Sequence, residues 1–465
     1  MNKIRRLGKD FGLLTLGSFS SKILNFLLVP LYTYILTTSE YGVVDIINTT
    51  VSLVYPILTL VISEAVIRFC LEKTNDKCQV WSISMLITTL GCLGMIMLSQ
   101  IIILTTFKPY LVFFVLHGIT MAYNSTISQF VKGNNQVKIY AIGGVINTVA
   151  VISLNIILLI VFKMGLIGYL ISLVLGHMSA LIFYIIALKL WRYTLPVNQL
   201  DHLLVKSMVK YSVPMIPNAI SWWISDSSDK YIVQYFCGIA VNGIYAVAYK
   251  IPSMLTTISN LFIGAWQISA FEDFESDEAK EYYSKVSTEF ISFILVVAGA
   301  LIFMTRPLAS VLFAKDFYYA WKFTPVLILA FVFSTVSSFW GTIYTAAKRT
   351  KMLFYSTMTA AIMNIALDLI LTPHVGAMGA ALATLISYMV ICVIRIVDSR
   401  KIMKLTIDWK RVIIELLLVI VEVVIIAFDS WISIAICLSL WLLNTFINRK
   451  SLGMVFKKVL HHRQE

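Results

Sequence analysis

Charged side chains that interrupt apolar stretches are the residues of this sequence best placed to do chemistry. The stretch from 211 to 236 holds Asp226, Asp229 and Lys230, together with several serines and two tryptophans. On a helix, Asp226 and Asp229 share a face, and the four-residue spacing from Asp226 to Lys230 allows an ion pair. Asp229 is then left without an obvious local cation. We therefore expect Asp229 to titrate or to bind a cation, and the whole stretch to face a polar cavity.

Three isolated basic residues lie in other apolar stretches. Lys22 lies about 16 Å along a helix from the start of its stretch, and Lys250 about 13 Å along its own. For both we favour a position on a cavity, with pairing inside a helix bundle as the alternative. Arg68 follows Glu64 by four residues, so the two share a helix face. Arg68 either lines the same cavity or marks the cytoplasmic end of its helix.

Four carboxylates have weaker indications of a role. Asp45 and Asp368 are expected near the outer ends of their stretches, where an exposed carboxylate has a low free-energy cost because water can reach it. Both are candidates for ion coupling. Glu422 lies deep in an apolar stretch, seven residues after Glu415 on the same helix face, and we expect it to have a packing partner inside the bundle.

Other reactive residue types form no recognisable constellation. The six cysteines show no CxxC or His-paired spacing, and we interpret them as free, buried and structural. His117 and His177 are interpreted as hydrogen-bonded packing residues. Because the sequence has no P-loop, metal cluster or nucleophile motif, we expect no catalytic residue, no metal site and no cofactor.

The elements that must position these charges are membrane helices. Of the 465 residues, 59% are hydrophobic and only 13% are charged. The apolar runs are about twenty residues long, which is the length of a spanning helix rather than of a barrel strand. The net charge of +13 comes from short clusters between these runs, which excludes a basic nucleic-acid-binding face.

Fourteen apolar windows have spanning length, which predicts an all-α polytopic membrane protein. The windows are 11–36, 43–69, 80–106, 109–131, 139–162, 165–188, 211–236, 241–270, 286–305, 321–346, 352–372, 376–397, 411–428 and 430–447.

The positions of Lys and Arg predict the orientation of these windows. With the N-terminus inside, 29 of the 37 basic residues fall on the cytoplasmic side. The outer side receives only Lys108, Lys163, Arg306, Lys315 and Lys322. Both termini are therefore expected in the cytoplasm, and the first window is expected to be a retained helix rather than a cleaved signal peptide.

A weak internal repeat divides the chain. Tyr41-Gly42 matches Asn242-Gly243 at an offset of 201 residues, and Gly165 and Gly168 match Gly376 and Gly379 at an offset of 211. Leu200 to Tyr211 has the spacing of an amphipathic helix at the cytoplasmic interface. We therefore predict two pseudo-symmetric six-helix lobes, 1–188 and 211–397, joined by a linker at 189–210. Residues 398–465 add a cytoplasmic loop, two further helices and a cytoplasmic tail.

Several segments form a further pattern along the chain. They are Ser20-Ser21-Lys22, Val29-Pro30-Leu31-Tyr32, Ser39-Glu40-Tyr41-Gly42-Val43-Val44-Asp45, Glu64-Ala65-Val66-Ile67-Arg68-Phe69, Asp229-Lys230-Tyr231, Asn242-Gly243-Ile244-Tyr245-Ala246-Val247-Ala248-Tyr249-Lys250 and Gly376-Ala377-Met378-Gly379-Ala380-Ala381. Together these segments resemble one family of transporters, the bacterial Wzx-type polysaccharide flippases of the multidrug/oligosaccharidyl-lipid/polysaccharide (MOP) superfamily.

The resemblance implies a V-shaped pair of lobes around a central cavity, working by alternating access. Its implied cargo is an undecaprenyl-diphosphate-linked oligosaccharide, moved from the cytoplasmic to the outer leaflet of the bacterial inner membrane. Cavity cations suited to a diphosphate are Lys22, Arg68 and Lys250. Polar cavity or ion-coupling residues are Asp226, Asp229, Lys230, Glu64, Asp45 and Asp368. The coupling ion is H⁺ or Na⁺.

The expected partners are the lipid-linked glycan, membrane lipids, and a polysaccharide polymerase with other assembly proteins. Two alternatives stay open. The same fold serves drug or metabolite exporters and flippases of other polyprenyl-linked precursors. An integral membrane polymerase or ligase also handles such glycans, but it generally needs a sizeable external loop. The longest outer connector here runs only from about Arg306 to Ala320.

Overall fold

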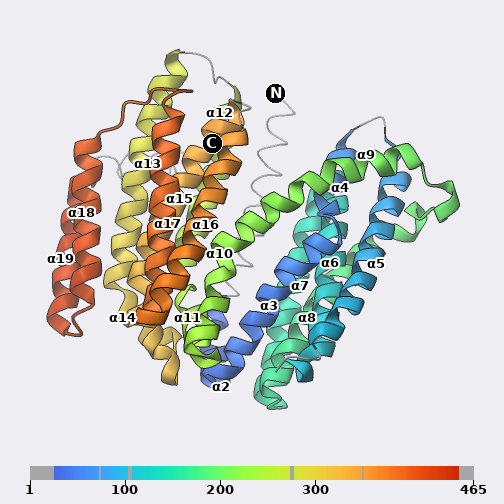
Figure 1. Cartoon of the computed structure of the whole chain (residues 1–465), viewed down its shortest axis with the longest axis horizontal. Helices are drawn as coiled ribbons and strands as arrows, with labels where there is room; N and C mark the ends of the chain where they lie inside the picture. The colour runs from blue at the N-terminus through green and yellow to red at the C-terminus, as the bar shows by residue number, and fades with distance from the viewer. Residues whose placement is uncertain (1–25, 73–74, 103–106, 273–276, 348–349, 450–465) are drawn as a thin grey trace, which may run out of the picture. The chain divides into compact units, whose positions relative to one another are not determined.

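The computed structural model describes residues 26–72, 75–102, 107–272, 277–347 and 350–449, and within these ranges the chain forms helices and no strand. Contacts divide the chain into two compact units, Met1–Trp223 and Ile224–Glu465. The boundary falls inside one helix, α10 (Ile216–Cys237), which contributes to both units (Figure 1). The finer division into lobes, linker and two added helices stays a prediction.

The first unit is a bundle of helices with one broken span. Its helices are α2 (Val29–Ile35), α3 (Thr38–Leu58), α4 (Ile62–Leu71), α5 (Lys77–Ile102), α6 (Leu111–Gly133), α7 (Val137–Asn155), α8 (Gly165–Leu188) and α9 (His202–Ser212).

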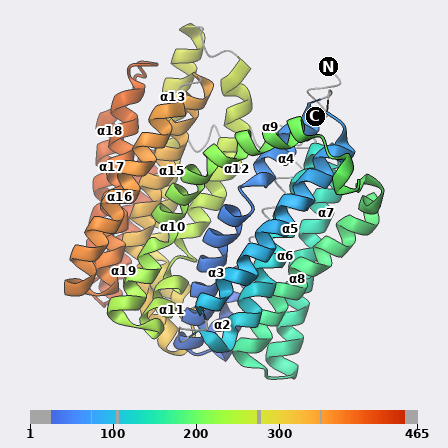
Figure 2. The ribbon, with the colours of Figure 1, turned by 45° about the vertical axis from the view of Figure 1, so that its right-hand side comes forward.

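The second unit is likewise a bundle of helices with one broken span. Its helices after α10 are α11 (Ile239–Ala248), α12 (Pro252–Glu272), α13 (Asp277–Phe303), α14 (Thr305–Leu312), α15 (Thr324–Ala346), α16 (Thr350–Val375), α17 (Ala377–Ser399), α18 (Trp409–Ile426) and α19 (Trp431–Ile447) (Figure 2).

Nine helices in the described ranges are long and apolar enough to cross a membrane, and each coincides with a predicted window. The window at 11–36 lies mostly outside the described residues. The window at 211–236 forms α10, whose three charges distinguish it from an ordinary apolar span. The windows at 411–428 and 430–447 form α18 and α19. The predicted all-α polytopic fold is confirmed.

Two predicted windows are each divided into two helices. The window at 43–69 forms α3 and α4, separated by a turn at which Leu60 and Val61 have φ values of 54° and 51°. The window at 241–270 forms α11 and α12, with Tyr249, Lys250 and Ile251 in the turn between them. Pro252 is the first residue of α12. Proline is tolerated there because the first N–H groups of a helix have no partner within the helix.

The glycines of the predicted repeat have matching roles in the two units. Gly165 and Gly376 have positive φ values of 54° and 65°, which glycine adopts without steric cost. Three residues later, a Cβ on Gly168 would lie 3.0 Å from Met164 Cβ, and one on Gly379 would lie 2.5 Å from the Leu371 carbonyl carbon. Both glycines therefore let a helix start in close contact with the preceding segment.

The predicted helix from Leu200 to Tyr211 corresponds to α9, and its place at the cytoplasmic interface stays a prediction. Asp201 caps its N-terminus by accepting a hydrogen bond from the Leu203 amide at 2.8 Å. Met208 and Leu200 are buried in the core of the first unit, beside Ile62 and Phe130. The helix is thus packed on its own unit by its apolar side, while Lys206 and Lys210 are exposed.

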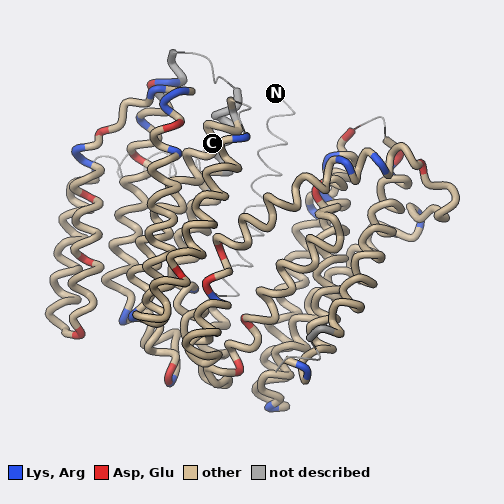
Figure 3. The backbone as a smooth tube through the Cα atoms, viewed as in Figure 1, with Lys and Arg blue, Asp and Glu red and all other residues tan. Residues whose placement is uncertain are grey.

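Lys and Arg gather mainly at one end of the helices within each unit (Figure 3). In the first unit that end carries Arg68, Lys77, Lys132, Lys138 and Lys189, where α4, α6 and α8 end and α5 and α7 begin. Such an asymmetry is what the predicted orientation requires.

All six cysteines are free, as expected. Cys70, Cys92, Cys392 and Cys437 are buried, but Cys78 and Cys237 are only half-buried, which corrects the expectation for those two.

Candidate functional site

Asp229 lies at the centre of a polar cluster inside the second unit, with only 2% of its surface exposed. Its Oδ2 accepts hydrogen bonds from the hydroxyls of Tyr245, at 2.9 Å, and of Tyr249. Its Oδ1 accepts one from the Lys230 amide at 2.9 Å. The two tyrosines are four residues apart, so α11 and the turn after it present both hydroxyls to the same carboxylate.

Helices α16 and α17 close the other side of this cluster. The Thr384 hydroxyl on α17 donates to Asp229 Oδ2 at 3.5 Å and accepts from the Asn364 amide of α16, also at 3.5 Å. Asn364 Oδ1 lies 3.3 Å from the Ser228 hydroxyl. Residues of four helices, α10, α11, α16 and α17, therefore meet around Asp229.

Asp368 adds a second buried carboxylate one helical turn after Asn364. It is fully buried, which corrects the expectation of an exposed carboxylate near the end of its span. Neither of its oxygens has a hydrogen-bond partner among the described residues, and its charge interacts with that of Asp229. The Thr372 hydroxyl one turn further along α16 is likewise buried without a described partner. We call Asp229, Tyr245, Tyr249, Asn364, Asp368 and Thr384 the Asp229–Asp368 cluster.

The chemistry of this cluster favours a small cation or a proton. Two carboxylates in a buried site cannot both stay ionised without compensation, because their charges repel and neither is hydrated. Carboxylate, amide and hydroxyl oxygens together offer the ligands that hard cations prefer. The cluster can therefore hold either a proton on one carboxylate or a cation among these oxygens.

The structure places the remaining acidic candidates outside this cluster. Asp226 is exposed on α10, one turn before Lys230, whose Nζ lies 5.9 Å from the ring centre of Tyr249. The Asp226–Lys230 ion pair stays a prediction. Asp45 on α3 and Glu64 on α4 are half-buried and belong to the first unit. Asp368 is thus the buried carboxylate of this cluster beside Asp229, while the charge of Asp226, on the same helix as Asp229, also interacts with that of Asp229.

The three predicted cavity cations have different surroundings. Lys22 lies outside the described residues. Arg68 stacks on the ring of Tyr211 at 4.5 Å and lies 3.6 Å from Glu72, with more than half of its side chain exposed. Lys250 is half-buried in the turn between α11 and α12. Arg68 belongs to the first unit and Lys250 to the second.

Some cluster residues were not anticipated from the sequence. Tyr245 and Tyr249 lie in a segment that carries the family resemblance, but their positions in the sequence do not indicate a contact with Asp229. Asn364 and Thr384 were missed altogether. The available signal was the spacing of Asn364, Asp368 and Thr372, which puts three polar residues on one face of an apolar helix.

His117 and His177 also come together, inside the first unit. Their ring centres are 5.5 Å apart, and His177 Nδ1 lies 3.4 Å from the Asn124 amide nitrogen. The contact with Asn124 agrees with the packing role expected for His177, whereas His117 Nδ1 is buried without a described partner.

The described residues form a polytopic α-helical membrane protein with buried carboxylates and a broken span in each unit. Solved structures of membrane transporters show the same fold. The lipid II flippase MurJ in an inward closed conformation matches with a TM-score of 0.73 at 17% identity, over 95% of this chain and 99% of that one. An inward-facing multidrug resistance MATE family transporter of the MOP superfamily matches with a TM-score of 0.65 at 12% identity, over 83% and 94%. A MOP superfamily transporter from Pyrococcus furiosus matches with a TM-score of 0.54 at 13% identity, over 84% and 95%.

The family model for polysaccharide biosynthesis proteins matches residues 7–267, which is more than half of the chain. The chain therefore belongs to the polysaccharide biosynthesis protein family. This match and the fold shared with the solved transporters agree with the predicted resemblance to polysaccharide flippases. No curated protein matches the sequence.

Proposed function

We propose that this protein is a flippase that moves an undecaprenyl-diphosphate-linked oligosaccharide from the cytoplasmic to the outer leaflet of a bacterial inner membrane. The observation that carries this proposal is the polysaccharide biosynthesis family match in a chain whose fold is shared by a lipid II flippase. A lipid-linked glycan is a membrane-embedded intermediate that is consistent both with polysaccharide biosynthesis and with the fold of a lipid flippase. The proposal includes alternating access, cytoplasmic termini and a polymerase as a downstream partner.

The cargo requires cations for its diphosphate, and Lys22, Arg68 and Lys250 are our candidates. Arg68 is available for this role because its side chain is more than half exposed and its guanidinium is held by Tyr211 and Glu72. Lys250 lies in a helix break, where the backbone can change conformation without disrupting a continuous helix.

We propose that the Asp229–Asp368 cluster couples transport to an ion gradient. Burial of both carboxylates and the unpartnered oxygens of Asp368 support this role, because a change in bound proton or cation there changes the charge inside the bundle. The exchanged ion is H⁺ or Na⁺, and gradients of each imposed separately distinguish them.

Deleting the gene and analysing lipid-linked intermediates tests the function. We expect one complete oligosaccharide lipid to accumulate facing the cytoplasm, and the wild-type gene to restore export. A variant with Lys22, Arg68 and Lys250 all replaced by Gln should reach the membrane but fail to restore export. Lys22→Arg should retain more function than Lys22→Gln, because the charge survives.

Other outcomes of this experiment would contradict the proposal. Accumulation of the complete oligosaccharide lipid on the outer face would point to a polymerase or ligase. An unchanged intermediate pool, with increased sensitivity to amphiphilic drugs, would point to an exporter. Full activity of the triple variant would remove the assigned role of the three cations.

A further inference from the structure

Helices α13, α18 and α19 pack against one another in the second unit and enclose a seam that the Asp229–Asp368 cluster does not involve. The seam residues of α18 recur every three or four positions, as a helix interface requires. They are Val412, Glu415, Val419, Glu422 and Ile426, all buried. The seam therefore carries two carboxylates that the proposed transport cycle does not use.

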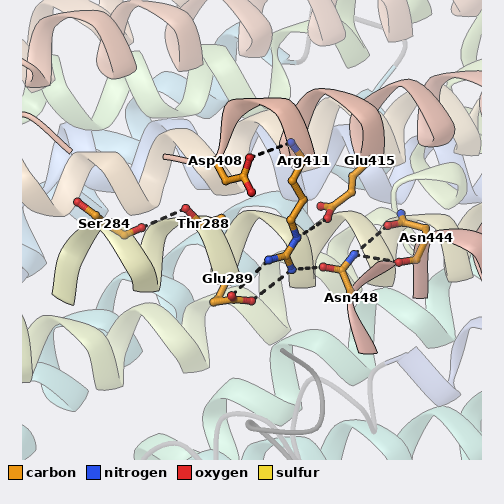
Figure 4. Close-up of polar contacts among 8 residues, drawn as sticks. All are labelled: Ser284, Thr288, Glu289, Asp408, Arg411, Glu415, Asn444 and Asn448. Carbon is orange, nitrogen blue, oxygen red and sulfur yellow. Dashed lines mark hydrogen bonds and ion pairs between the residues drawn. The ribbon is translucent and has the colours of Figure 1, made fainter. Parts of the chain in front are cut away.

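One end of the seam is neutralised by Arg411 (Figure 4). Its Nε lies 2.9 Å from Glu415 Oε1, and its Nη1 and Nη2 lie 3.3 and 3.4 Å from the carboxylate of Glu289 on α13. Arg411 also donates to Asn448, which follows α19 and hydrogen-bonds back to Asn444. This network joins all three helices and pairs Glu415 with Arg411.

Arg306 neutralises the other end. Its Nη2 lies 2.9 Å from Asp429 and donates to the Ile426 carbonyl at 3.2 Å, while Nη1 donates to the Ser430 carbonyl at 3.4 Å. The guanidinium therefore holds the Ile426 carbonyl at the end of α18, where the helix dipole favours a cation, and also the Ser430 carbonyl just before α19. Both ends of the α18–α19 pair are fastened by arginines whose charges are already matched.

Glu422 lies between these ends and is fully buried. Neither carboxyl oxygen has a hydrogen-bond partner among the described residues. The carboxyl group rests against Gly299 of α13, since a Cβ on that glycine would lie 3.0 Å from Oε2 and 3.2 Å from Oε1. The Trp441 indole beside it donates its N–H to the Val296 carbonyl instead.

Within the described part of the chain, no hydrogen bond or ion pair joins the Glu422 carboxyl group to a charged residue. Arg411 and Glu415 lie toward one end, with Glu415 seven residues and about 10 Å away along α18. Asp429 is seven residues away in the other direction, with Arg306 beside it. On α19 the titratable neighbour is Cys437, whose thiol donates to the Glu422 backbone carbonyl at 3.5 Å. Helix α15, which also packs on α18, contains no Asp, Glu, His, Lys or Arg in its described range.

We propose that Glu422 is a proton-binding site, separate from the Asp229–Asp368 cluster, that controls the docking of the α18–α19 pair on α13. An ionised carboxylate without a donor or cation is strongly disfavoured in this seam, so the docked pair holds Glu422 as a neutral carboxylic acid. Loss of the proton requires water or a cation at Gly299. Because both ends are fastened, the seam then opens at its middle.

Infrared spectroscopy of the purified full-length protein in nanodiscs tests the proton directly. At neutral pH, the wild type should show a carboxylic acid carbonyl band that disappears in Glu422→Gln. Glu415→Gln is the matched control, because it changes a carboxylate on the same face of α18 that is already paired with Arg411, and it should keep the band. If Glu422→Gln removes only a carboxylate band, Glu422 is ionised and the proposal is wrong.

Cys437 reports on docking, since it is fully buried in the seam. With the other five cysteines replaced by alanine, a small maleimide should react slowly with Cys437 at neutral pH in both wild type and Glu422→Gln. At alkaline pH the wild type should react at least about tenfold faster than Glu422→Gln, because only the wild type loses a proton in the seam. Equal rates would overturn the control of docking. Because the two proteins are compared at the same pH, ionisation of the Cys437 thiol affects both rates alike. The assay requires no transported substrate.

Discussion

At the scale of single residues, the two carboxylates of the Asp229–Asp368 cluster have opposite surroundings. Asp229 accepts hydrogen bonds from two tyrosine hydroxyls, a threonine hydroxyl and a backbone amide, all of which stabilise a negative charge. Asp368 has no such donor among the described residues. A site with one stabilised charge and one unsupported carboxyl can exchange an ion without creating two unpaired charges at once.

Replacing Asp229 by Asn should slow uphill transport more than passive exchange in proteoliposomes under an imposed proton or sodium gradient. Removing a hydrogen-bonded charge from a buried site costs about 1.5–3 kcal/mol. Loss of that free energy from ion binding weakens the affinity by roughly tenfold or more, and we expect the gradient-driven rate to fall with it. Asp398→Asn is the matched control, because Asp398 lies at the end of α17 and pairs with exposed Lys401. If both rates fall together, or neither falls, the cluster is structural.

At the scale of elements, the cluster depends on how closely α17 approaches α16. Gly379 of α17 contacts the backbone of α16 at Leu371 and Thr372. The cluster residues Asn364 and Asp368 lie on the same helix, α16. Thr384, one and a half turns beyond Gly379 on α17, contacts Asp229. A small displacement between the two helices would therefore separate the ligands of the cluster.

Gly379→Ala should destabilise the protein by about 1–3 kcal/mol, because its Cβ would lie 2.5 Å from the Leu371 carbonyl carbon and would force the helices apart. The measurement is thermal unfolding of the purified protein in detergent. Gly144→Ala provides the control, since a Cβ at that position on α7 would meet nothing within 4 Å. Gly144→Ala should be neutral or slightly stabilising, by up to about 1 kcal/mol. Equal effects of the two substitutions would argue against close packing at Gly379.

At the scale of the whole molecule, the charge distribution predicts one orientation in the membrane. The predicted cytoplasmic side contains 29 of the 37 basic residues. If one span were missing or added, all later loops would change sides and this asymmetry would disappear. Helix α9, with exposed Lys206 and Lys210, then lies at the cytoplasmic surface, and the segment Lys315–Lys322 lies outside.

Cysteine labelling of intact cells tests this orientation. In a background without the six native cysteines, Asp316→Cys should react with a membrane-impermeant maleimide, because Asp316 is exposed on the predicted outer side. Lys206→Cys should react only after the membrane is permeabilised. The opposite pattern would reverse the topology and, with it, the direction of the proposed transport.

The amino-acid sequence by itself determined the class of the protein, the positions of most spanning helices, the amphipathic helix α9 and the repeat that relates Gly165 to Gly376. These features are local, because the partition of a helix into lipid depends on the length and polarity of its own residues. Only the tertiary structure decided which charged residues have partners. Thr384 meets Asp229 across 155 positions of sequence, Asp368 is fully buried, and Glu422 has no described partner. Those outcomes depend on how each helix is rotated against neighbours distant in the sequence, and the spacing of residues within one helix does not specify that rotation.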